Sequence, residues 1–401
     1  MDDERIAGLL SRLDDGPNRP PRVDLARAVR DGRRRRRNRR VVAAGSTALA
    51  VVAAVTVVPL LREPTPPDPA PATVTPPTAC EVETLPLPPG YVSGGVTGGD
   101  PTGRYLVGLL QLPDRKEPHP VLWVDGQVRE LPASVRSAPL REITSSGWMI
   151  GQDMDAGYVY RFDPANQPGS PDGDGADPVR RLPGGPNLHP AGINEAGRIA
   201  GNRYSPDDPN WFVPMVWASP TSDPVELPLP GPGWTGRALD IDDDGTIIGT
   251  VATDARYPRG YLWRSDGTGE FLPSVPAASE FRPVSIRNSW VIGHTWREQP
   301  RPGRETVRLN LATGEFVPLP AMFSAVSVNA RGWVAGVGDR GAGLFTDAGL
   351  LDLGVPRPDP ARSDLVYVVV SVVSDDGRTI AGRWSPDGKR LPAQPVRWSC
   401  R

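Results

Sequence analysis

The sequence predicts an all-β fold, a seven-bladed β-propeller over residues 80–401, preceded by one transmembrane helix and a short helical tail. Three observations lead to this prediction. A turn-and-strand motif ending in glycine recurs seven times, an aromatic strand follows most copies, and a strand ending in Leu-Pro usually comes next. A repeat of about 45 residues is the size of a four-stranded propeller blade.

Seven glycines mark the repeat. Each closes a strand that follows a turn, as in INEAGRIAG and IDDDGTIIG, and neighbouring glycines lie 43 to 50 residues apart. Short β-branched strands separated by Asp-Gly or Asn-x-x-Gly turns are typical of all-β proteins. No stretch with a 3.6-residue apolar period follows residue 61, which excludes a helical solenoid. The repeat anchors are Gly108, Gly151, Gly201, Gly249, Gly293, Gly336 and Gly382.

Two more strands complete each unit. The third strand carries an aromatic residue at its end, and the fourth strand ends in Leu-Pro in most copies. The sixth copy has Leu-Asp-Leu-Gly at 351–354 instead. The third strands end at Trp123, Phe162, Trp217, Trp263 and Trp398, and the Leu-Pro pairs lie at 131–132, 182–183, 227–228, 272–273 and 319–320.

These motifs resemble the HAF-type extracellular repeats, whose pattern is Ile-Asn-x-x-Gly-x-x-x-Gly, an aromatic strand, and then Asp-Leu-Gly. Residues 193–201 and 351–354 match this pattern best, and the resemblance extends over residues 80–401. The resemblance implies an exported repeat protein with no catalytic activity attached to the repeat.

The two ends of the predicted ring complement each other. The seventh copy stops at Arg401 before a fourth strand can form, whereas VETLPLP at 82–88 is similar to VELPLP at 225–230, the fourth strand of the third copy. We therefore expect the N-terminal segment to supply the missing strand, which removes an open sheet edge.

The only two cysteines lie at this seam. Cys80 and Cys400 fall where other copies have the tight turn between the third and fourth strands, and their spacing excludes a CxxC motif. We predict a disulfide between them, which an exported location permits. The alternative is two unrelated buried thiols.

Residues 41–61 predict a membrane anchor. These 21 residues carry no charge, and as a helix they would span about 30 Å, the thickness of a hydrocarbon core. Residues 62–79 form a Pro/Thr-rich stalk that favours polyproline II. A cleaved signal peptide and a buried core helix are the alternatives, but a 40-residue basic region is long for a signal peptide.

The charges beside the predicted span indicate its orientation. Residues 1–40 hold thirteen Arg against seven Asp or Glu, and the net charge of the chain is −2. By the positive-inside rule this basic tail is cytoplasmic and the rest lies outside. We interpret the run as a topology signal and lipid contact, with the bilayer as partner, and expect no nucleic-acid partner. The run comprises Arg33, Arg34, Arg35, Arg36, Arg37, Arg39 and Arg40.

Catalytic and metal-binding motifs are not apparent. The three histidines, His119, His189 and His294, belong to different copies and lack paired spacing, so we interpret them as surface or loop residues and predict no metal or cofactor. Ser-Asp-Asp-Gly at 374–377 is similar to the Asp-box of sialidase-like propellers but lacks one residue between Asp and Gly.

Two acidic clusters have structural interpretations. Asp172, Asp174 and Asp177 lack the final glutamate of a calcium loop and are expected to form a solvated loop. In the second cluster, residues 242–245 align with the Asn194–Gly197 turn, so Asp242, Asp243 and Asp244 are expected to be turn formers that bond local backbone. This cluster comprises Asp240, Asp242, Asp243 and Asp244.

Three functional hypotheses remain. The first is an extracytoplasmic binding module for a protein, glycan or small ligand, retained by the anchor, and it is not an enzyme. The second is a transmembrane regulator whose cytoplasmic tail binds a partner such as a sigma factor. Ile6, Leu9, Leu10 and Leu13 would share one helical face there, and the order of tail, Arg cluster, span and stalk resembles membrane-bound anti-sigma regulators. The third is a propeller-type hydrolase.

Overall fold

The computed structural model describes part of the chain, from residue 74 to the C-terminus. The described residues are 74–113, 118–129, 131, 135, 140–153, 156–162, 179–205, 211–254, 258–275, 280–297, 303–356, 367–385 and 392–401. The predicted tail, the predicted span and residues 62–73 of the stalk lie outside them, as do Asp172, Asp174 and Asp177. None of the described residues forms a helix with the length and apolar character that crossing a membrane requires.

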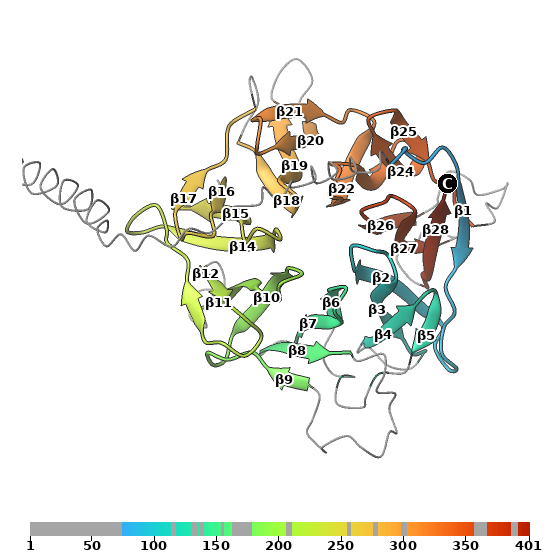
Figure 1. Cartoon of the computed structure of the whole chain (residues 1–401), viewed down its shortest axis with the longest axis horizontal. Coiled ribbons are helices and arrows are strands. Elements are labelled where there is room, and N and C mark those ends of the chain that lie inside the picture. Colours follow the sequence, from blue (N-terminus) through green and yellow to red (C-terminus); the bar gives the residue numbers. More distant parts are fainter. Residues whose placement is uncertain are drawn as a thin grey trace, which may run out of the picture. The chain divides into compact units, whose positions relative to one another are not determined.

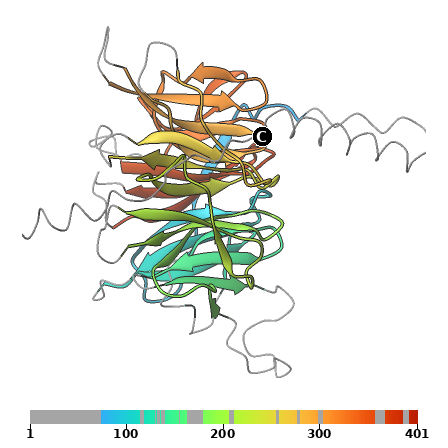
Figure 2. The same cartoon turned by 90° about the vertical axis from the view of Figure 1, so that its left-hand side faces the viewer.

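Seven four-stranded antiparallel sheets are arranged in a ring, which confirms the predicted seven-bladed propeller (Figure 1). Blades 1 to 6 are each one consecutive run of four strands, in chain order from the centre of the ring outward. Blade 7 has the order β26, β27, β28, β1 from the inside out. Seen edge-on, the strands run between the two faces of the ring (Figure 2).

Blades 1 to 3 are each formed by four short strands. Blade 1 comprises β2 (Ser93–Gly99), β3 (Tyr105–Gln111), β4 (His119–Val124) and β5 (Gln127–Arg129). Blade 2 comprises β6 (Leu140–Ile143), β7 (Trp148–Gln152), β8 (Gly157–Arg161) and β9 (Val179–Arg181). Blade 3 comprises β10 (Leu188–Ile193), β11 (Ile199–Tyr204), β12 (Phe212–Trp217) and β13 (Pro224–Glu226).

The remaining blades follow the same plan. Blade 4 comprises β14 (Thr235–Ile241), β15 (Ile247–Ala252), β16 (Arg259–Trp263) and β17 (Gly269–Phe271). Blade 5 comprises β18 (Arg282–Arg287), β19 (Trp290–Arg297), β20 (Gly303–Asn310) and β21 (Glu315–Pro318). Blade 6 comprises β22 (Met322–Val328), β23 (Val334–Gly338), β24 (Gly341–Thr346) and β25 (Gly349–Asp352). Blade 7 comprises β26 (Tyr367–Val373), β27 (Thr379–Ser385), β28 (Gln394–Cys400) and β1 (Cys80–Thr84).

The Leu-Pro motif, which is Leu-Gly in blade 6, connects neighbouring blades. Its leucine is buried in all seven blades, and the carbonyl oxygen of the residue after it accepts a hydrogen bond from the tryptophan of the next blade in four cases. Trp263 Nε1, for example, donates to the Pro228 oxygen at 2.7 Å. Because each tryptophan ring is itself fully buried, this bond satisfies a donor that would otherwise lack a partner. The leucines are Leu85, Leu131, Leu182, Leu227, Leu272, Leu319 and Leu353.

The anchor glycines allow the first two strands of each blade to approach closely. A Cβ built on Gly249 would lie 2.1 Å from the Arg237 carbonyl oxygen and 2.8 Å from the ring of Trp263. The backbone contact recurs at Gly108, Gly201, Gly293, Gly336 and Gly382, where a Cβ would lie 1.9 to 2.5 Å from a carbonyl oxygen of the innermost strand. The repeated glycine therefore marks a position without space for a side chain.

The N-terminal strand closes the ring, as predicted. β1 pairs antiparallel with β28 over five residues, from Cys80 opposite Cys400 to Thr84 opposite Val396. The two cysteines form a disulfide across this pair, with their Cα atoms 4.0 Å apart. Trp123 of blade 1 donates to the Pro86 oxygen, so blade 1 contacts this segment as other blades contact their neighbours.

Candidate functional site: the central channel

Every innermost strand carries a β-bulge at the equivalent position, where its register against the second strand shifts by one residue. A bulge re-aims the side chains beside it. In every blade except blade 3, the residue after the bulge lines the channel at the centre of the ring. Going round the ring, this residue is Gly98, Glu142, Gly192, Asp240, Ser285, Ser327 and Val372.

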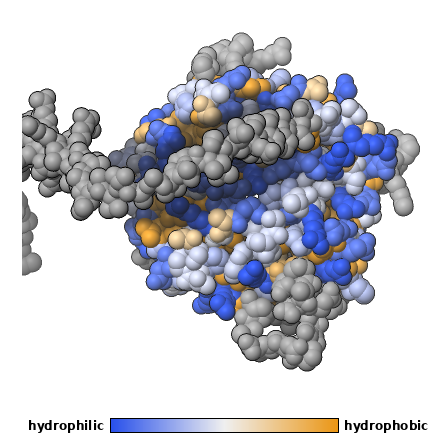
Figure 3. Space-filling model, in the orientation of Figure 1, coloured by the Kyte–Doolittle hydropathy of each residue, from blue (hydrophilic) through white to orange (hydrophobic). Residues whose placement is uncertain are grey.

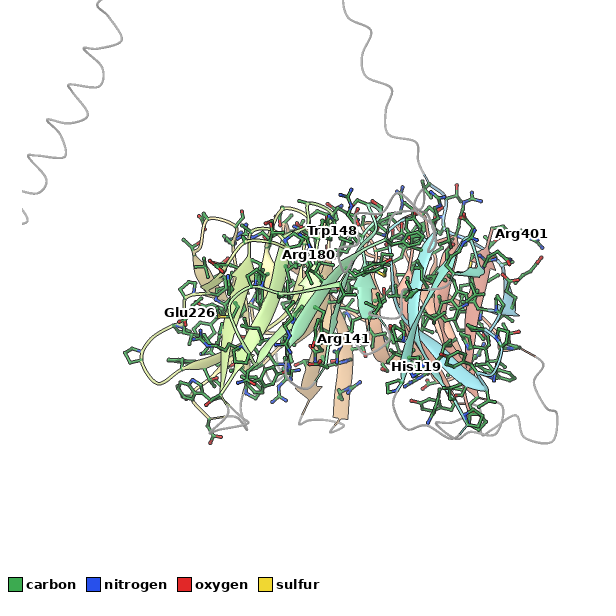
Figure 4. The ribbon with its side chains drawn as sticks, turned by 90° about the horizontal axis from the view of Figure 1, so that it is seen from below. His119, Arg141, Trp148, Arg180, Glu226 and Arg401 are labelled. Carbon is green, nitrogen blue, oxygen red and sulfur yellow. A yellow bond between two sulfur atoms is a disulfide. The ribbon has the colours of Figure 1, made fainter. Side chains whose placement is uncertain are left out.

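A cavity of about 350 Å³ lies in this channel and is lined by residues from all seven innermost strands. It extends to the turns that join the first and second strands, an end of the ring that we call the turn end. Hydrophilic residues surround the hollow at the centre of the ring in Figure 3. Figure 4 shows Trp148, which follows one of these turns, near the turn end and Arg141 toward the opposite end.

Two carboxylates lie deep in the cavity on blades 2 and 4. Glu142 Oε2 accepts a hydrogen bond from the Ile193 backbone nitrogen at 3.0 Å. Asp240 accepts three bonds of 2.8 to 2.9 Å, from Ser285 Oγ and from the backbone nitrogens of Ile241 and Ile286. Each carboxylate therefore bonds the next blade, and in blade 3, between them, the position after the bulge is occupied by Gly192. A Cβ on that glycine would lie 2.9 Å from Asp240 Oδ1.

The protein environment favours the protonated form of both acids. Burial, reinforced by the nearby charge of Asp240, raises the pKa of Glu142 to about 8. Burial also raises the pKa of Asp240 to about 6, although its three hydrogen bonds act in the opposite direction. Both carboxylates would gain stability from a positive group in the cavity.

The opposite side of the cavity combines valines with the hydroxyl groups of Ser285, Ser327 and Ser371. Blades 5, 6 and 7 contribute Val284, Val326, Val328, Val369 and Val372. Val326 is one of the few large apolar side chains of the described residues that stays exposed, at 38%. The cavity therefore has a carboxylate side and a side that carries valines together with serine hydroxyl groups.

An ion-paired arginine lies at the turn end. Arg287 Nη1 contacts Asp243 at 2.7 Å, and its Nη2 contacts Asp375 at 2.9 Å. Since these residues belong to blades 5, 4 and 7, the guanidinium connects blades that are not neighbours. Among the described residues that line the cavity, Arg287 is the one cation, against Asp100, Glu142, Glu195, Asp240 and Asp375.

The aspartates of the 242–244 turn bond both their own turn and neighbouring blades. Asp244 bonds the Thr246 nitrogen of its own turn, as expected. Asp242 also accepts bonds from Asn288 and Ser289 of blade 5, and Asp243 accepts one from the Glu195 nitrogen of blade 3. Asp240 precedes this turn, belongs to β14 and lines the channel.

The histidines and the Asp-box-like segment noted in the sequence contact other residues of the protein. His119 Nδ1 bonds Tyr91 Oη at 2.7 Å, and the His189 ring packs on Tyr204. Burial, reinforced by Arg304, lowers the pKa of His294 to about 4. Asp376 of the Asp-box-like segment bonds Ser374 and the Arg378 nitrogen. In the described part of the chain, no group of three or more His, Cys, Asp or Glu is arranged to hold a metal ion.

Glu142 was missed in the sequence because it precedes the repeated turn motif. Its only sequence signal is its position relative to Gly151, which matches that of Asp240 relative to Gly249. To recognise from this alignment that both residues face the channel, one must know where the bulge lies, and the sequence does not reveal its position.

The chain matches no protein-family model, and no curated protein matches its sequence. Solved structures share its fold. An oligogalacturonate lyase in complex with manganese is 11% identical, with a TM-score of 0.54 over 81% of this chain and 94% of that chain. An oligogalacturonate lyase from Vibrio parahaemolyticus is 8% identical, with a TM-score of 0.53 over 80% of this chain and 97% of that one.

A larger enzyme contains a similar propeller. Prolyl oligopeptidase B from Galerina marginata is 11% identical, with a TM-score of 0.50 over 78% of this chain, and the match spans about half of that enzyme. At these identities the comparisons show a common propeller fold, and a fold of this kind hosts many functions.

Proposed function

We propose that this protein is an extracytoplasmic binding module whose channel takes a ligand with a positively charged group and a short aliphatic part. The observation that carries the proposal is the two-sided cavity, with Glu142 and Asp240 on one side and valines on the other. A cation between the two acids would relieve the unfavourable burial of their charges. The alkyl part would cover apolar surface that is exposed to solvent without a ligand.

Binding of a small amine tests this proposal and its pH dependence. The full chain in zwitterionic lipid nanodiscs should bind n-butylammonium more tightly than n-butanol, measured by ligand-observed NMR. Because the pKa values of Glu142 and Asp240 are raised to about 8 and about 6, both acids are largely protonated at pH 5. Amine affinity should therefore rise between pH 5 and pH 9, by about tenfold or more for one full charge interaction.

Matched variants locate the site. Glu142→Gln and Asp240→Asn should each weaken amine binding and flatten its pH dependence. Glu226→Gln is the control, because Glu226 lies on the outer strand of blade 3, where it pairs with Arg203 at the surface (Figure 4). Equal affinity for butylammonium and butanol in the unmodified protein would refute the proposal.

We also propose that residues 41–61 anchor the chain in a membrane, with the Arg33–Arg40 run on the cytoplasmic side and the propeller outside. This proposal rests on the charge-free run and on the positive-inside rule. The disulfide supports it, because such bonds persist in oxidising compartments.

A second candidate function is transmembrane regulation, favoured by the apolar face of Ile6, Leu9, Leu10 and Leu13 in the tail. Full-length protein purified from its host in mild detergent should then retain a cytoplasmic protein such as a sigma factor. A chain with Leu9→Asp and Leu13→Asp should lose it, and the Arg12→Gln chain, with the apolar face intact, is the control. If all three chains retain the same proteins, the tail serves topology alone.

We propose no enzymatic activity for this chain. The lyase and peptidase activities belong to the proteins of similar fold, and a hydrolase would need two carboxylates positioned about a substrate bond. Here the Asp240 carboxylate already accepts three hydrogen bonds from the protein.

A further inference from the structure

A second cavity, of about 270 Å³, lies at the seam between blade 7 and blade 1. It involves the beginning of β2 and the ends of β3 and β27, so it lies away from the turn end. Its blade 1 wall is formed by Gly94, Gly95, Val96, Leu109 and Leu110. Among the described residues that line it, Arg383 is the only charged one.

Arg383 is half-buried and incompletely bonded. Its Nη2 donates to Tyr367 Oη at 3.2 Å, and its guanidinium lies 5.6 Å from the centre of the tyrosine ring. Its Nε is buried and has no hydrogen-bond partner. No carboxylate among the described residues pairs with it, whereas a buried donor of this kind is normally satisfied.

The equivalent residue of blade 3 is fully satisfied. Asn202 follows the anchor Gly201 as Arg383 follows Gly382. The Asn202 side chain donates to the Ala238 oxygen at 2.9 Å and accepts from the Ala238 nitrogen at 2.8 Å, which closes the seam between blades 3 and 4. In blade 7 an arginine with an unused donor replaces this closed arrangement.

Blade 1 leaves space for the arginine. A Cβ on Gly95 would lie 2.8 Å from Arg383 Cβ and 3.0 Å from its Cδ, so a side chain there would displace the stem of the arginine. The glycine and the arginine together form a small groove with apolar walls and a single cation.

We propose that this groove binds the carboxylate of a small ligand with a short aliphatic part, with Arg383 as its anchor. Guanidinium groups pair with planar carboxylates through two parallel N–H donors, and Nε is one of the donors that such a pair uses. The leucine and valine side chains suit an alkyl group. The cavity is just below the size range of about 300 to 1,000 Å³ for drug-sized ligands, so a short acid or the terminal residue of a peptide fits.

The proposal is independent of the amine site, because the two sites select opposite charges. Thr97 borders both cavities, but no carboxylate lines the Arg383 groove among the described residues. Failure of one site therefore leaves the other standing, and Glu142→Gln should leave carboxylate binding unchanged.

The test compares butyrate with butyramide, its neutral counterpart, on the full chain in zwitterionic nanodiscs by ligand-observed NMR. Butyrate should bind at least about tenfold more tightly than butyramide. Arg383→Gln should abolish this preference, whereas Arg383→Lys should keep part of it, because the charge stays and the Nε donor is lost. The control is Arg237→Gln, since Arg237 of blade 4 packs on Phe212 of blade 3.

Two further arms complete the experiment. A short peptide ending in valine is compared with its C-terminally amidated form. Tighter binding of the free peptide than of butyrate assigns the groove to chain termini, and tighter binding of butyrate assigns it to small acids. Equal affinity of butyrate and butyramide, or an unchanged preference in Arg383→Gln protein with a native circular dichroism spectrum, would overturn the proposal.

Discussion

Gly249→Ala protein should unfold at a markedly lower urea concentration than the unmodified protein. The new methyl group would lie 2.1 Å from the Arg237 carbonyl oxygen and 2.8 Å from the Trp263 ring, so the first and second strands of blade 4 must separate. Trp263 would then be displaced from its bond to the Pro228 oxygen, which connects blade 4 to blade 3. We expect a loss of about 3 kcal/mol or more, at the upper end of overpacking effects, measured by urea denaturation with tryptophan fluorescence.

Gly303→Ala provides the matched control, because it makes the same substitution in another strand. A Cβ on Gly303 meets no atom within 4 Å, and its φ lies outside the left-handed region. The alanine should stabilise the protein slightly, by about 0.5 kcal/mol, because it restricts the unfolded chain. If the two alanines have the same effect, the anchor glycines reflect turn preference and not a shortage of space.

Much of the fold could be predicted from the sequence because every blade must satisfy the same packing requirements, and the same residue types therefore recur. Six of the seven anchor glycines lie beneath an inner-strand carbonyl, and every blade buries a leucine at or just after its outer strand, so these residues recur at fixed spacing. The closing strand could be recognised for the same reason. Leu85 and Leu227 are both buried, and the oxygens of Pro86 and Pro228 both accept a hydrogen bond from a tryptophan of the next blade.

The candidate sites could not be predicted from the repeat in this way. Glu142, Asp240 and Arg383 occupy positions at which the blades differ, so no repeated pattern marks them. Their environment depends on the register shift in the innermost strands and on the neighbouring blade. Asp240 shows the difficulty, because the sequence places it beside three turn residues and the bulge turns it into the channel.

Removal of the seam disulfide should have the other large effect. The Cys80–Cys400 bond spans 320 residues, for which the chain-entropy model gives about 6 kcal/mol, and losses of about 2 to 5 kcal/mol are typical of native disulfides. Double Cys80→Ser, Cys400→Ser protein should therefore unfold at lower urea than the oxidised chain. Hydrogen exchange of the β1 amides should accelerate most, because this strand would be held only by non-covalent contacts.

Those contacts should keep the ring closed in the absence of denaturant. Five residue pairs join β1 to β28, Leu85 stays buried, and Trp123 still bonds the Pro86 oxygen. Glu83 also pairs with Arg397, although its exposure makes this pair a small contribution. The unmodified protein treated with dithiothreitol should therefore match the double variant in urea, and the reductant should leave the double variant unchanged. Equal urea midpoints for the oxidised chain and the double variant would show that pairing and packing hold the seam without help from the covalent bond.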